Sequence, residues 1–543
     1  MMREREAFLA DALDAVVGGG AVPTPHPDDA WQLAVAAFVA GERLEADRAT
    51  ALSREAIERL DAASEPVVRV TAYAARVFAA AAELHPGSWA AVAPGLTPTG
   101  DPLVDALADV ERLGAGSDAA FARYLLAEAA LTSARVGLAA RLPAPDPVGF
   151  LARDGRDHAF GVVFTVLGTR VAAFNGRVAE AQQLLEGATS EVPLLELLLV
   201  ATDSLVHGNA ADPQRTRALV DRVRLQNPRP DSRIAAGCHL LASYGLIALD
   251  DVRGGAELVL AAGGGPDLDR LMIVDRAIGF ELLVNAALVD DDPDAAESWA
   301  ARAEQLAGSP ICDASLERTR CRILLARGDA ADAARAAERA GAMARAEGRM
   351  IEAAESDRLA GRAAIAANDG SAGRRLQAMA DEAHLTGHRA AVEAAARELR
   401  SAGRRLRPLA GTEWHGLSER EREVARLLLD GLSNADIASA LYVSPHTVRV
   451  HVSRVLAAFG VASRFALAAR VPASRAAPVG GLTGRQSEVV AQLSTGASNA
   501  EIAERLGISV KTVEKHLHEI MRRLSVTSRV GILRAEAAPA APE

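Results

Sequence analysis

The chain has 543 residues, which exceeds the roughly 250–300 residues at which a single hydrophobic core stops growing, so we expect two or more domains. Half of the residues are apolar but only 3% are aromatic, and the alanine-rich stretch between residues 50 and 400 favours packed helices over sheets. No apolar run approaches the ~20 residues that span a bilayer, and three cysteines are too few for a disulfide framework, which argues against a membrane protein and a disulfide-rich secreted domain.

The formal net charge of −11 is unevenly divided along the chain. Residues 404–534 contain 19 basic and 11 acidic side chains, whereas residues 1–403 have a net charge of −17. A basic end on an acidic body is the electrostatic pattern of a region that binds a polyanion. Both lysines of the chain, Lys511 and Lys515, lie in this basic end.

Residues 1–102 are predicted to form an irregular helical segment. Two loops interrupt it, GGGAVPTPHPDD at residues 18–29 and PGLTPTGDP at residues 94–102. The chain opens with alternating charges and not with a cationic stretch followed by a long apolar one, so we expect no secretory signal and a cytoplasmic protein. This segment indicates no function.

Residues 103–403 are predicted to be a helical-repeat domain with a sensor or interaction role. Amphipathic helices alternate there with short turns about 32–42 residues apart, which is the period of stacked helix hairpins. The predicted turns contain Asn175, Asn209, Asp250, Asp292, Asp329 and Asp369. The segment at 321–348 resembles a tetratricopeptide hairpin, although that family's aromatic positions are missing from most of the repeats. An irregular helical domain remains the alternative.

The sequence argues against several kinds of binding site. Cys238, Cys312 and Cys321 lack metal-ligand spacing and are predicted to be buried small side chains. The chain has no Gly-Lys pair, so the GGG runs at 18–20 and 263–265 are loops and not phosphate-binding sites. The acidic run at 289–298 lacks the glycine and the terminal glutamate of a calcium loop, and a phosphorylated receiver domain would need alternating strands and helices. We expect no catalytic residue, metal or cofactor.

A linker at residues 404–416 leads to two C-terminal segments that align without a gap at an offset of 65 residues. The first segment begins LSEREREVARLLLDGLSNADIASALYVSPHTVRVHVSRVL at Leu417, and the second begins LTGRQSEVVAQLSTGASNAEIAERLGISVKTVEKHLHEIM at Leu482. They match at 19 of 48 positions, so they are two copies of one domain. The predicted boundaries are 417–470 and 482–536, with a linker at 471–481 and a disordered tail at 537–543.

Capping residues divide each copy into four short helices. Capping boxes are predicted at Ser418 with Glu421, at Thr483 with Gln486 and at Ser498 with Glu501. The remaining predicted boundary residues are glycines that end the first helix and serines that open later ones: Gly431, Gly496, Ser433, Ser444, Ser509, Ser463 and Ser528. The second helix, a short turn and a longer third helix form a helix-turn-helix.

The third helix of each copy has an apolar side and an outward side. The apolar residues at helical spacing are Val448, Val452, Val455, Leu456 and Phe459 in the first copy and Val513, Leu517, Ile520, Met521 and Leu524 in the second. The outward residues are His446, Arg449, Val450, Ser453 and Arg454 in the first copy and Lys511, Glu514, Lys515, His518 and Arg522 in the second. A helix fits the major groove of DNA, where such side chains reach bases and phosphates.

Both copies resemble the LuxR-type (FixJ/NarL-type) DNA-binding domain, whose L-T/S start, G-x-S-N-x-E/D-I-A, S-x-x-T-V and following His are present twice. The resemblance covers about a fifth of the chain. It implies that Arg449, Val450 and Ser453, and in the second copy Glu514, Lys515 and His518, read bases. It also implies that Thr447, His451, Thr512 and His516 steady the third helix or touch phosphate. Glu514 departs from a position that is often basic, so it either accepts from a cytosine amino group or weakens the second copy.

The sequence therefore predicts an all-α chain: a tetratricopeptide-like solenoid followed by two small four-helix LuxR-type domains. We interpret it as a bacterial transcription regulator and not an enzyme, with double-stranded DNA, RNA polymerase and a small-molecule or protein effector as partners. The DNA-binding residues are predicted to be Thr447, Arg449, Val450, His451, Ser453, Arg454, Lys511, Thr512, Glu514, Lys515, His516, His518 and Arg522. Fourth helices dimerise in relatives, so a homodimer and an intramolecular pseudo-dimer are both open. The alternative function is a protein-interaction scaffold.

Overall fold

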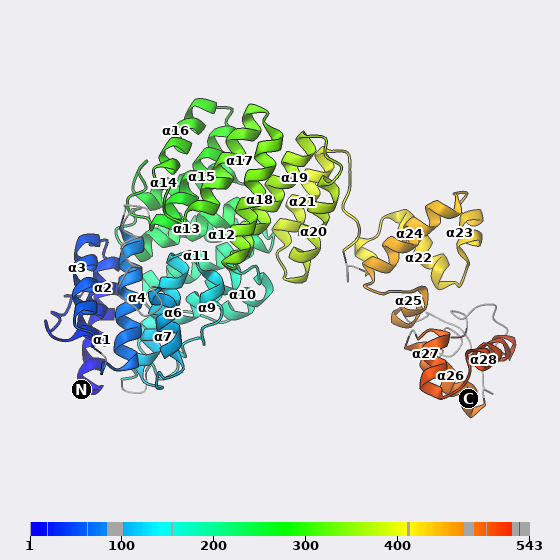
Figure 1. Cartoon of the computed structure of the whole chain (residues 1–543), viewed down its shortest axis with the longest axis horizontal. Coiled ribbons are helices and arrows are strands. Elements are labelled where there is room, and N and C mark those ends of the chain that lie inside the picture. Colours follow the sequence, from blue (N-terminus) through cyan, green and yellow to red (C-terminus); the bar gives the residue numbers. More distant parts are fainter. Residues whose placement is uncertain are drawn as a thin grey trace. The chain divides into compact units, whose positions relative to one another are not determined.

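The computed structural model describes residues 2–18, 20–61, 63–83, 101–153, 156–227, 229–409, 413–471, 483–495, 497–523 and 532. These residues form α-helices and two short 3₁₀ helices, and the isolated bridge between Arg153 and Arg156 is their one β interaction. The chain divides into a helical unit, Met1–Arg405, and a C-terminal unit, Leu406–Glu543. None of the described helices is both long and apolar enough to span a bilayer. The all-α prediction is therefore confirmed (Figure 1).

The helical unit begins with helices whose core contains a cluster of aromatic side chains. Phe38 lies at the centre, with its ring 5.4 Å from Phe78, 5.5 Å from Phe121 and 6.0 Å from Tyr124 between centroids. The predicted loop at 18–29 separates the first two helices, and the loop predicted at 94–102 lies almost wholly outside the described residues. The elements are α1 (Met2–Val17), α2 (Ala30–Glu42), α3 (Ala46–Glu58), α4 (Pro66–Ala82), α6 (Pro102–Val110), α7 (Ser117–Thr132), α8 (Val136–Ala139) and η1 (Ala159–Gly161).

The rest of the helical unit is a row of helix hairpins that lie side by side (Figure 1). The helices are α9 (Val162–Phe174), α10 (Val178–Leu185), α11 (Pro193–Asn209), α12 (Pro213–Gln226), α13 (Arg233–Ala248), α14 (Val252–Gly263), α15 (Ile273–Val289), α16 (Pro293–Glu304), α17 (Asp313–Arg327), α18 (Ala330–Ala346), α19 (Met350–Ala366), α20 (Ala372–Leu385) and α21 (Arg389–Ser401). Small buried alanines such as Ala333, Ala337 and Ala360 allow neighbouring helices to approach closely.

Each hairpin turns at a residue with left-handed backbone geometry. These residues are Gly176, Ala211, Asp250, Asp291, Gly328 and Asn368, all with positive φ. Each lies at or within two residues of a turn residue predicted from sequence, so the predicted turns are confirmed. Asp212, Asp251 and Asp292 then cap the second helix of their hairpins by accepting a hydrogen bond from a backbone amide in its first turn. The three cysteines are buried, as predicted.

The hairpin row closes on itself, because its beginning contacts its end. The side-chain amide of Asn175, after α9, donates to the carbonyl of Gly348, before α19, at 2.9 Å. Two backbone bonds join the same regions, from Gly137 N to Glu347 O at 2.7 Å and from Ala179 N to Thr386 O at 3.1 Å. We call these contacts the seam. A solenoid with contacts only between neighbouring repeats would lack them.

The C-terminal unit contains two modules with the same helix order. The first module consists of η2 (Glu413–Gly416), α22 (Glu419–Leu429), α23 (Asn434–Ala440), α24 (Pro445–Ala458) and α25 (Arg464–Arg470). The second consists of α26 (Gly484–Ser494), α27 (Asn499–Leu506) and α28 (Val510–Arg523). Ile532 is buried and helical, and the rest of the second module's predicted fourth helix lies outside the described residues.

Candidate nucleic-acid interface

The first module is built by local capping and a small apolar core. Ser418 with Glu421 and Ser433 with Asp436 form capping boxes at the starts of α22 and α23, although sequence reasoning found only the first of these. Gly431 has a φ of 85°, so it ends the first helix in the left-handed conformation as predicted. The predicted core residues Val448, Val452, Val455 and Phe459 are buried and Leu456 is partly buried, so α24 is held against α22 and α23.

The second module repeats this construction. Capping boxes are present at Thr483 with Gln486 and at Ser498 with Glu501, as predicted. Val513, Leu517 and Ile520 bury the inner side of α28, and Met521 is partly buried. The predictions for Leu482, Gly496, Leu524 and Ser528 lie outside the described residues.

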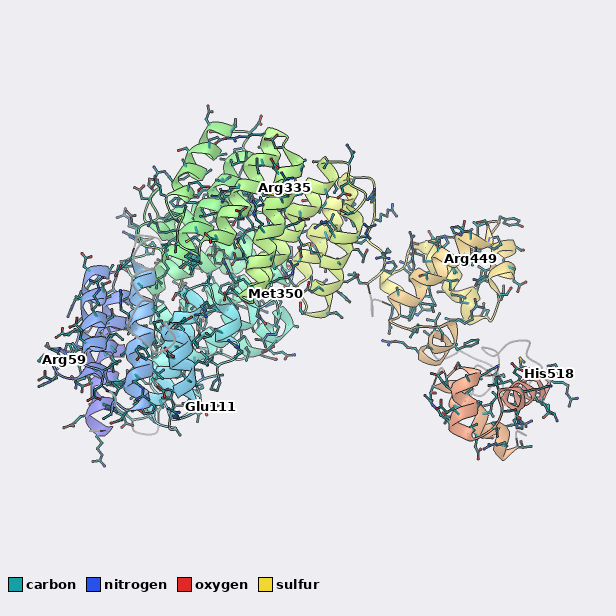
Figure 2. All side chains as sticks on the ribbon, in the orientation of Figure 1. Arg59, Glu111, Arg335, Met350, Arg449 and His518 are labelled. Carbon is teal, nitrogen blue, oxygen red and sulfur yellow. The ribbon has the colours of Figure 1, made fainter. Side chains whose placement is uncertain are left out.

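Each third helix presents the outward residues predicted from sequence. On α24 the exposed residues are His446, Arg449, Val450, Ser453 and Arg454. On α28 they are Lys511, Glu514, Lys515, His518 and Arg522. Arg449 and His518 are labelled in Figure 2 and come from corresponding faces of α24 and α28. These side chains are free to meet a partner without unfolding the module.

The threonines of the third helices belong to the helix starts. The Thr447 hydroxyl lies 2.8 Å from the Ser444 hydroxyl, and the Thr447 amide donates to that same oxygen at 3.0 Å. Thr512 and Ser509 repeat this arrangement at 2.7 Å and 3.1 Å. The side chains at these two positions therefore stabilise the first turn of α24 and α28, one of the two roles that the resemblance implied.

The two histidines that follow, His451 and His516, are partly buried, unlike the exposed residues of the outward faces. The Nδ1 atom of His451 lies 3.9 Å from the Glu421 carboxylate. Among the described residues, neither His451 Nδ1 nor His516 Nδ1 has a hydrogen-bond partner. Their positions suit a structural role better than direct base reading.

One hydrogen bond joins the first and third helices in both modules, but its donor and acceptor are exchanged. The donor lies on the third helix in the first module and on the first helix in the second. In the first module the Arg454 guanidinium donates to Glu421 at 3.2 Å. In the second module the corresponding residues are Gln486 and Glu519, and the glutamine amide donates to the glutamate at 3.4 Å. Arg454 is therefore anchored within its own module as well as being exposed on the predicted DNA-binding face.

This contact affects the ionisation of Glu421. Burial acts to raise the pKa of the Glu421 carboxyl, but the Ser418 amide and hydroxyl and the Arg454 guanidinium outweigh burial and hold the pKa below its usual value. The carboxylate therefore stays ionised at neutral pH, so the capping box and the link to α24 are both maintained.

Arginine braces that sequence reasoning missed hold the first helix to the turn of the helix-turn-helix. Arg485 donates through Nη2 to the carbonyl of Leu506 at 2.6 Å, and Arg420 donates in the same way to Leu441. Arg420 and Arg485 are each the fourth residue of their repeat copy. The presence of arginine at this position in both copies is the feature of the sequence that could have predicted the contact. In the first module Arg464 also donates to the carbonyl of Leu432, at 3.2 Å.

Comparison with known families agrees with this geometry. Residues 415–471 and residues 481–535 each match the family described as bacterial regulatory proteins, luxR family. The C-terminal region of this chain consists of LuxR-family helix-turn-helix domains. The first module carries one match and the second module carries the other, so the tandem arrangement that the sequence predicted is supported by two separate matches.

Individual relatives align with only short stretches of this chain. A protein named as an HTH-type transcriptional regulator of Mycobacterium bovis is 48% identical over 75 residues, which are 14% of this chain and 8% of that protein. A nitrate/nitrite response regulator homologue of Haemophilus influenzae is 45% identical over 53 residues, 10% of this chain and 26% of the relative. Spore germination protein GerE of Bacillus subtilis is 44% identical over 48 residues, 9% of this chain and 65% of GerE. The chain thus matches less than two thirds of the length of each of these relatives.

Proposed function

We propose that this protein is a DNA-binding transcription regulator that reads two adjacent DNA sites with its two LuxR-family modules. The observation that carries the proposal is the pair of exposed third-helix faces, on α24 and α28, each backed by buried apolar residues on the inner side of the same helix. A helix supported in this way can enter the major groove while the first two helices pack behind it.

The charge of the C-terminal region supports a polyanionic partner. Residues 404–534 have an excess of basic side chains, and residues 1–403 have an excess of acidic ones. Cationic side chains that neutralise phosphates release counterions, and this release provides much of the affinity of proteins for DNA. The acidic helical unit repels DNA, so binding is expected to be restricted to the C-terminal unit.

The two modules are expected to read different sequences, because their outward residues differ at corresponding positions. Arg449 of the first module corresponds to Glu514 of the second, and Val450 corresponds to Lys515. Arginine pairs with guanine and valine contacts the thymine methyl group, whereas glutamate accepts from the cytosine amino group. The preferred operator is therefore an asymmetric site with two unlike halves.

The spacing of the two halves is limited by the linker. The 11 residues from 471 to 481 reach at most ~36–40 Å when fully extended. This reach suffices for half-sites one turn of DNA apart on the same face. In this proposal the helical unit binds an effector, either a small molecule or a protein, and alters how the modules meet DNA.

The test is a selection of duplexes from a random library by the full chain, followed by titration of the selected duplex at 50 mM and 200 mM salt. We expect an asymmetric consensus with two unlike halves and a loss of at least about tenfold in affinity between the two salt concentrations. A palindromic consensus would contradict the reading by two unlike modules. Absence of any salt-sensitive binding to duplex DNA would overturn the proposed function and favour a protein-docking role.

A further inference from the structure

The helical unit contains a partly open cavity of about 200 Å³ between its middle and its last hairpins. One wall is mainly apolar and comes from helices α9, α11, α13 and α15, although α15 also contributes Asp275 and Glu281. Its apolar residues include Phe174, Leu205, Ile247, Ile278 and Leu282. The opposite wall comes from α17 and α19 and carries charged side chains. A cavity of about 150 Å³ can hold a benzene-sized molecule, so this one has room for an aromatic ring with a short polar arm.

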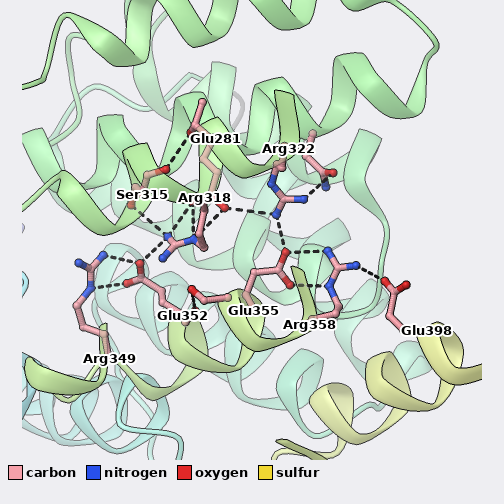
Figure 3. Close-up of polar contacts among 12 residues, drawn as sticks. Glu281, Ser315, Arg318, Arg322, Arg349, Glu352, Glu355, Arg358 and Glu398 are labelled. Carbon is pink, nitrogen blue, oxygen red and sulfur yellow. Dashed lines mark hydrogen bonds and ion pairs between the residues drawn. The ribbon is translucent and has the colours of Figure 1, made fainter. Parts of the chain in front are cut away.

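Arg318 on α17 lies at the centre of the charged wall and is 2% exposed. Its Nη2 atom bonds Glu281 at 2.7 Å, Glu352 at 2.6 Å and the Ser315 hydroxyl at 3.1 Å (Figure 3). Arg349 pairs with the other side of Glu352, at 2.6 Å from Nε. The Arg318 side chain is therefore fixed in place by partners on α15, α17 and α19.

Arg322, one helical turn further along α17, continues the same network. It bonds Glu281 at 3.3 Å and Glu355 at 2.5 Å, and Glu355 in turn accepts from Arg358 at 2.8 Å. Arg358 reaches Glu398 on α21 at 2.6 Å. Guanidiniums and carboxylates alternate along this chain of contacts in equal numbers, so the network is electrically neutral (Figure 3).

Two donors of this network are left without an acceptor. Within the described part of the chain, the Nη1 atom of Arg318 and the Nε atom of Arg322 are buried and have no hydrogen-bond partner. Both arginines line the cavity. A buried N–H group without an acceptor is costly, and more so when the group is charged, so an acceptor in the cavity would be stabilised there.

The charge balance selects the kind of acceptor. A carboxylate or phosphate in the cavity would bring a full negative charge against a network whose own charges already cancel. An uncompensated charge beside the buried Arg318 and Arg322 is costly, whereas a carbonyl or amide oxygen satisfies an N–H group without adding charge. Asp275 on the cavity wall shows the same effect, since burial raises its pKa to about 6 although Arg170 and Arg233 act to lower it.

We propose that this cavity is the effector site and that it binds a neutral, mostly apolar small molecule whose carbonyl or amide oxygen accepts hydrogen bonds from Arg318 and Arg322. The inference deepens the proposed function by placing the effector in the helical unit and naming its chemistry. Binding at the cavity is measured without DNA, so it is tested separately from DNA recognition.

The experiment compares three probes that share a phenylpropyl body but differ in the head group. They are 3-phenylpropanamide, 3-phenylpropanoate and propylbenzene, each titrated into the full chain by calorimetry. We expect the amide to bind with a Kd of about 1 mM or tighter, the range for a ligand of this size. The carboxylate and the hydrocarbon are expected to bind at least about tenfold more weakly, because one adds a charge and the other lacks an acceptor.

Two variants locate the site. Ile278→Trp fills the cavity from its apolar wall and is expected to abolish amide binding. Arg322→Lys keeps the positive charge but removes the Nε–H donor, and is expected to weaken amide binding about tenfold, whereas Arg335→Lys on an exposed surface leaves it unchanged (Figure 2). Circular dichroism checks that each variant is folded, and Arg322→Lys keeps the test valid if Ile278→Trp is not.

The proposal is overturned if the amide shows no saturable binding at 10 mM, if the three probes bind equally, or if Arg322→Lys binds the amide as well as the parent does. These outcomes are distinct from failure of the proposed function. A chain that binds selected DNA but not the amide refutes the cavity proposal alone, and a chain that binds the amide but no DNA refutes the regulator proposal alone.

Discussion

Tyr442 in the first module and Gly507 in the second occupy the same position of the helix-turn-helix turn, and both have left-handed backbone geometry, with φ of 55° and 64°. Glycine adopts this conformation without a steric penalty, whereas a residue with a Cβ atom pays roughly 1–2 kcal/mol. The Tyr442 side chain is 96% exposed, so packing within the module does not offset that cost. The turn of the first module is therefore strained and that of the second is not.

We predict that Tyr442→Gly stabilises the first module by about 1 kcal/mol, because it removes this strain. Hydrogen–deuterium exchange of the full chain should show about fivefold slower exchange in peptides from α22 and α24, with no change in α26 and α28. The reverse variant, Gly507→Tyr, should speed exchange in the second module. Equal exchange in the parent and Tyr442→Gly would contradict the assignment of strain to this turn.

We predict that Arg449→Ala and Lys515→Ala each weaken binding to the selected duplex by about 1–3 kcal/mol. Arg449→Ala should also relax base preference in one half of the operator, since it removes a base contact. Arg426→Ala, which removes the same charge from an exposed position on α22, serves as the control and should change affinity less and preference not at all. Unchanged affinity in both third-helix variants would reject the assigned faces.

The buried carboxyl of Glu42 predicts a pH-dependent stability. Burial raises its pKa to about 7 from an ordinary value of 4.5, with Arg233 acting in the opposite direction, and its Oε2 atom has no hydrogen-bond partner among the described residues. Between these pH values the unfolded chain has released a proton that the folded chain retains. The contribution of Glu42 to the free energy of unfolding therefore falls as pH rises from about 4.5 to about 7 and is constant above that.

Glu42→Gln should remove this contribution and leave the pH dependence of the other groups unchanged. At pH 8 the variant should be more stable than the parent by up to about 3 kcal/mol, and near pH 4.5 the two should be nearly equal. Urea denaturation of the helical unit in the full chain, at pH 4.5, 6 and 8, measures both. Glu111→Gln on the surface is the control, and a stability difference that is the same at all three pH values would count against the buried carboxyl as its source (Figure 2).

The seam predicts an unusual sensitivity at Gly348. A Cβ atom there would lie 2.6 Å from the backbone nitrogen of Gly137, and Gly348 has a φ of 71°. Gly348→Ala should therefore destabilise the helical unit by about 2–4 kcal/mol. Gly328→Ala, at a left-handed position with open space around it, should cost only about 1 kcal/mol in the same urea titration. Similar losses in the two variants would show that the close contact at the seam has no cost of its own.

The helix boundaries of the two modules could be predicted from the sequence. Capping residues and the spacing of core residues depend on neighbours only a few positions away. Ser418, Gly431 and Ser444 stand where the structure begins or ends a helix. The buried ion network could not be predicted, since Arg318 pairs with Glu281 at a separation of 37 residues. An arginine on a helix is usually exposed, so its burial depends on helix packing that the sequence alone does not specify.

Contacts at the seam have a consequence for how the protein is made. Asn175 meets its partner Gly348 across 173 residues, so the ribosome must release most of the helical unit before the first hairpin can find the place where it docks. An open repeat array can nucleate at any point and grow during synthesis. In this protein the early hairpins keep an exposed surface until the last hairpins have been translated. During this delay chaperones can bind the nascent chain.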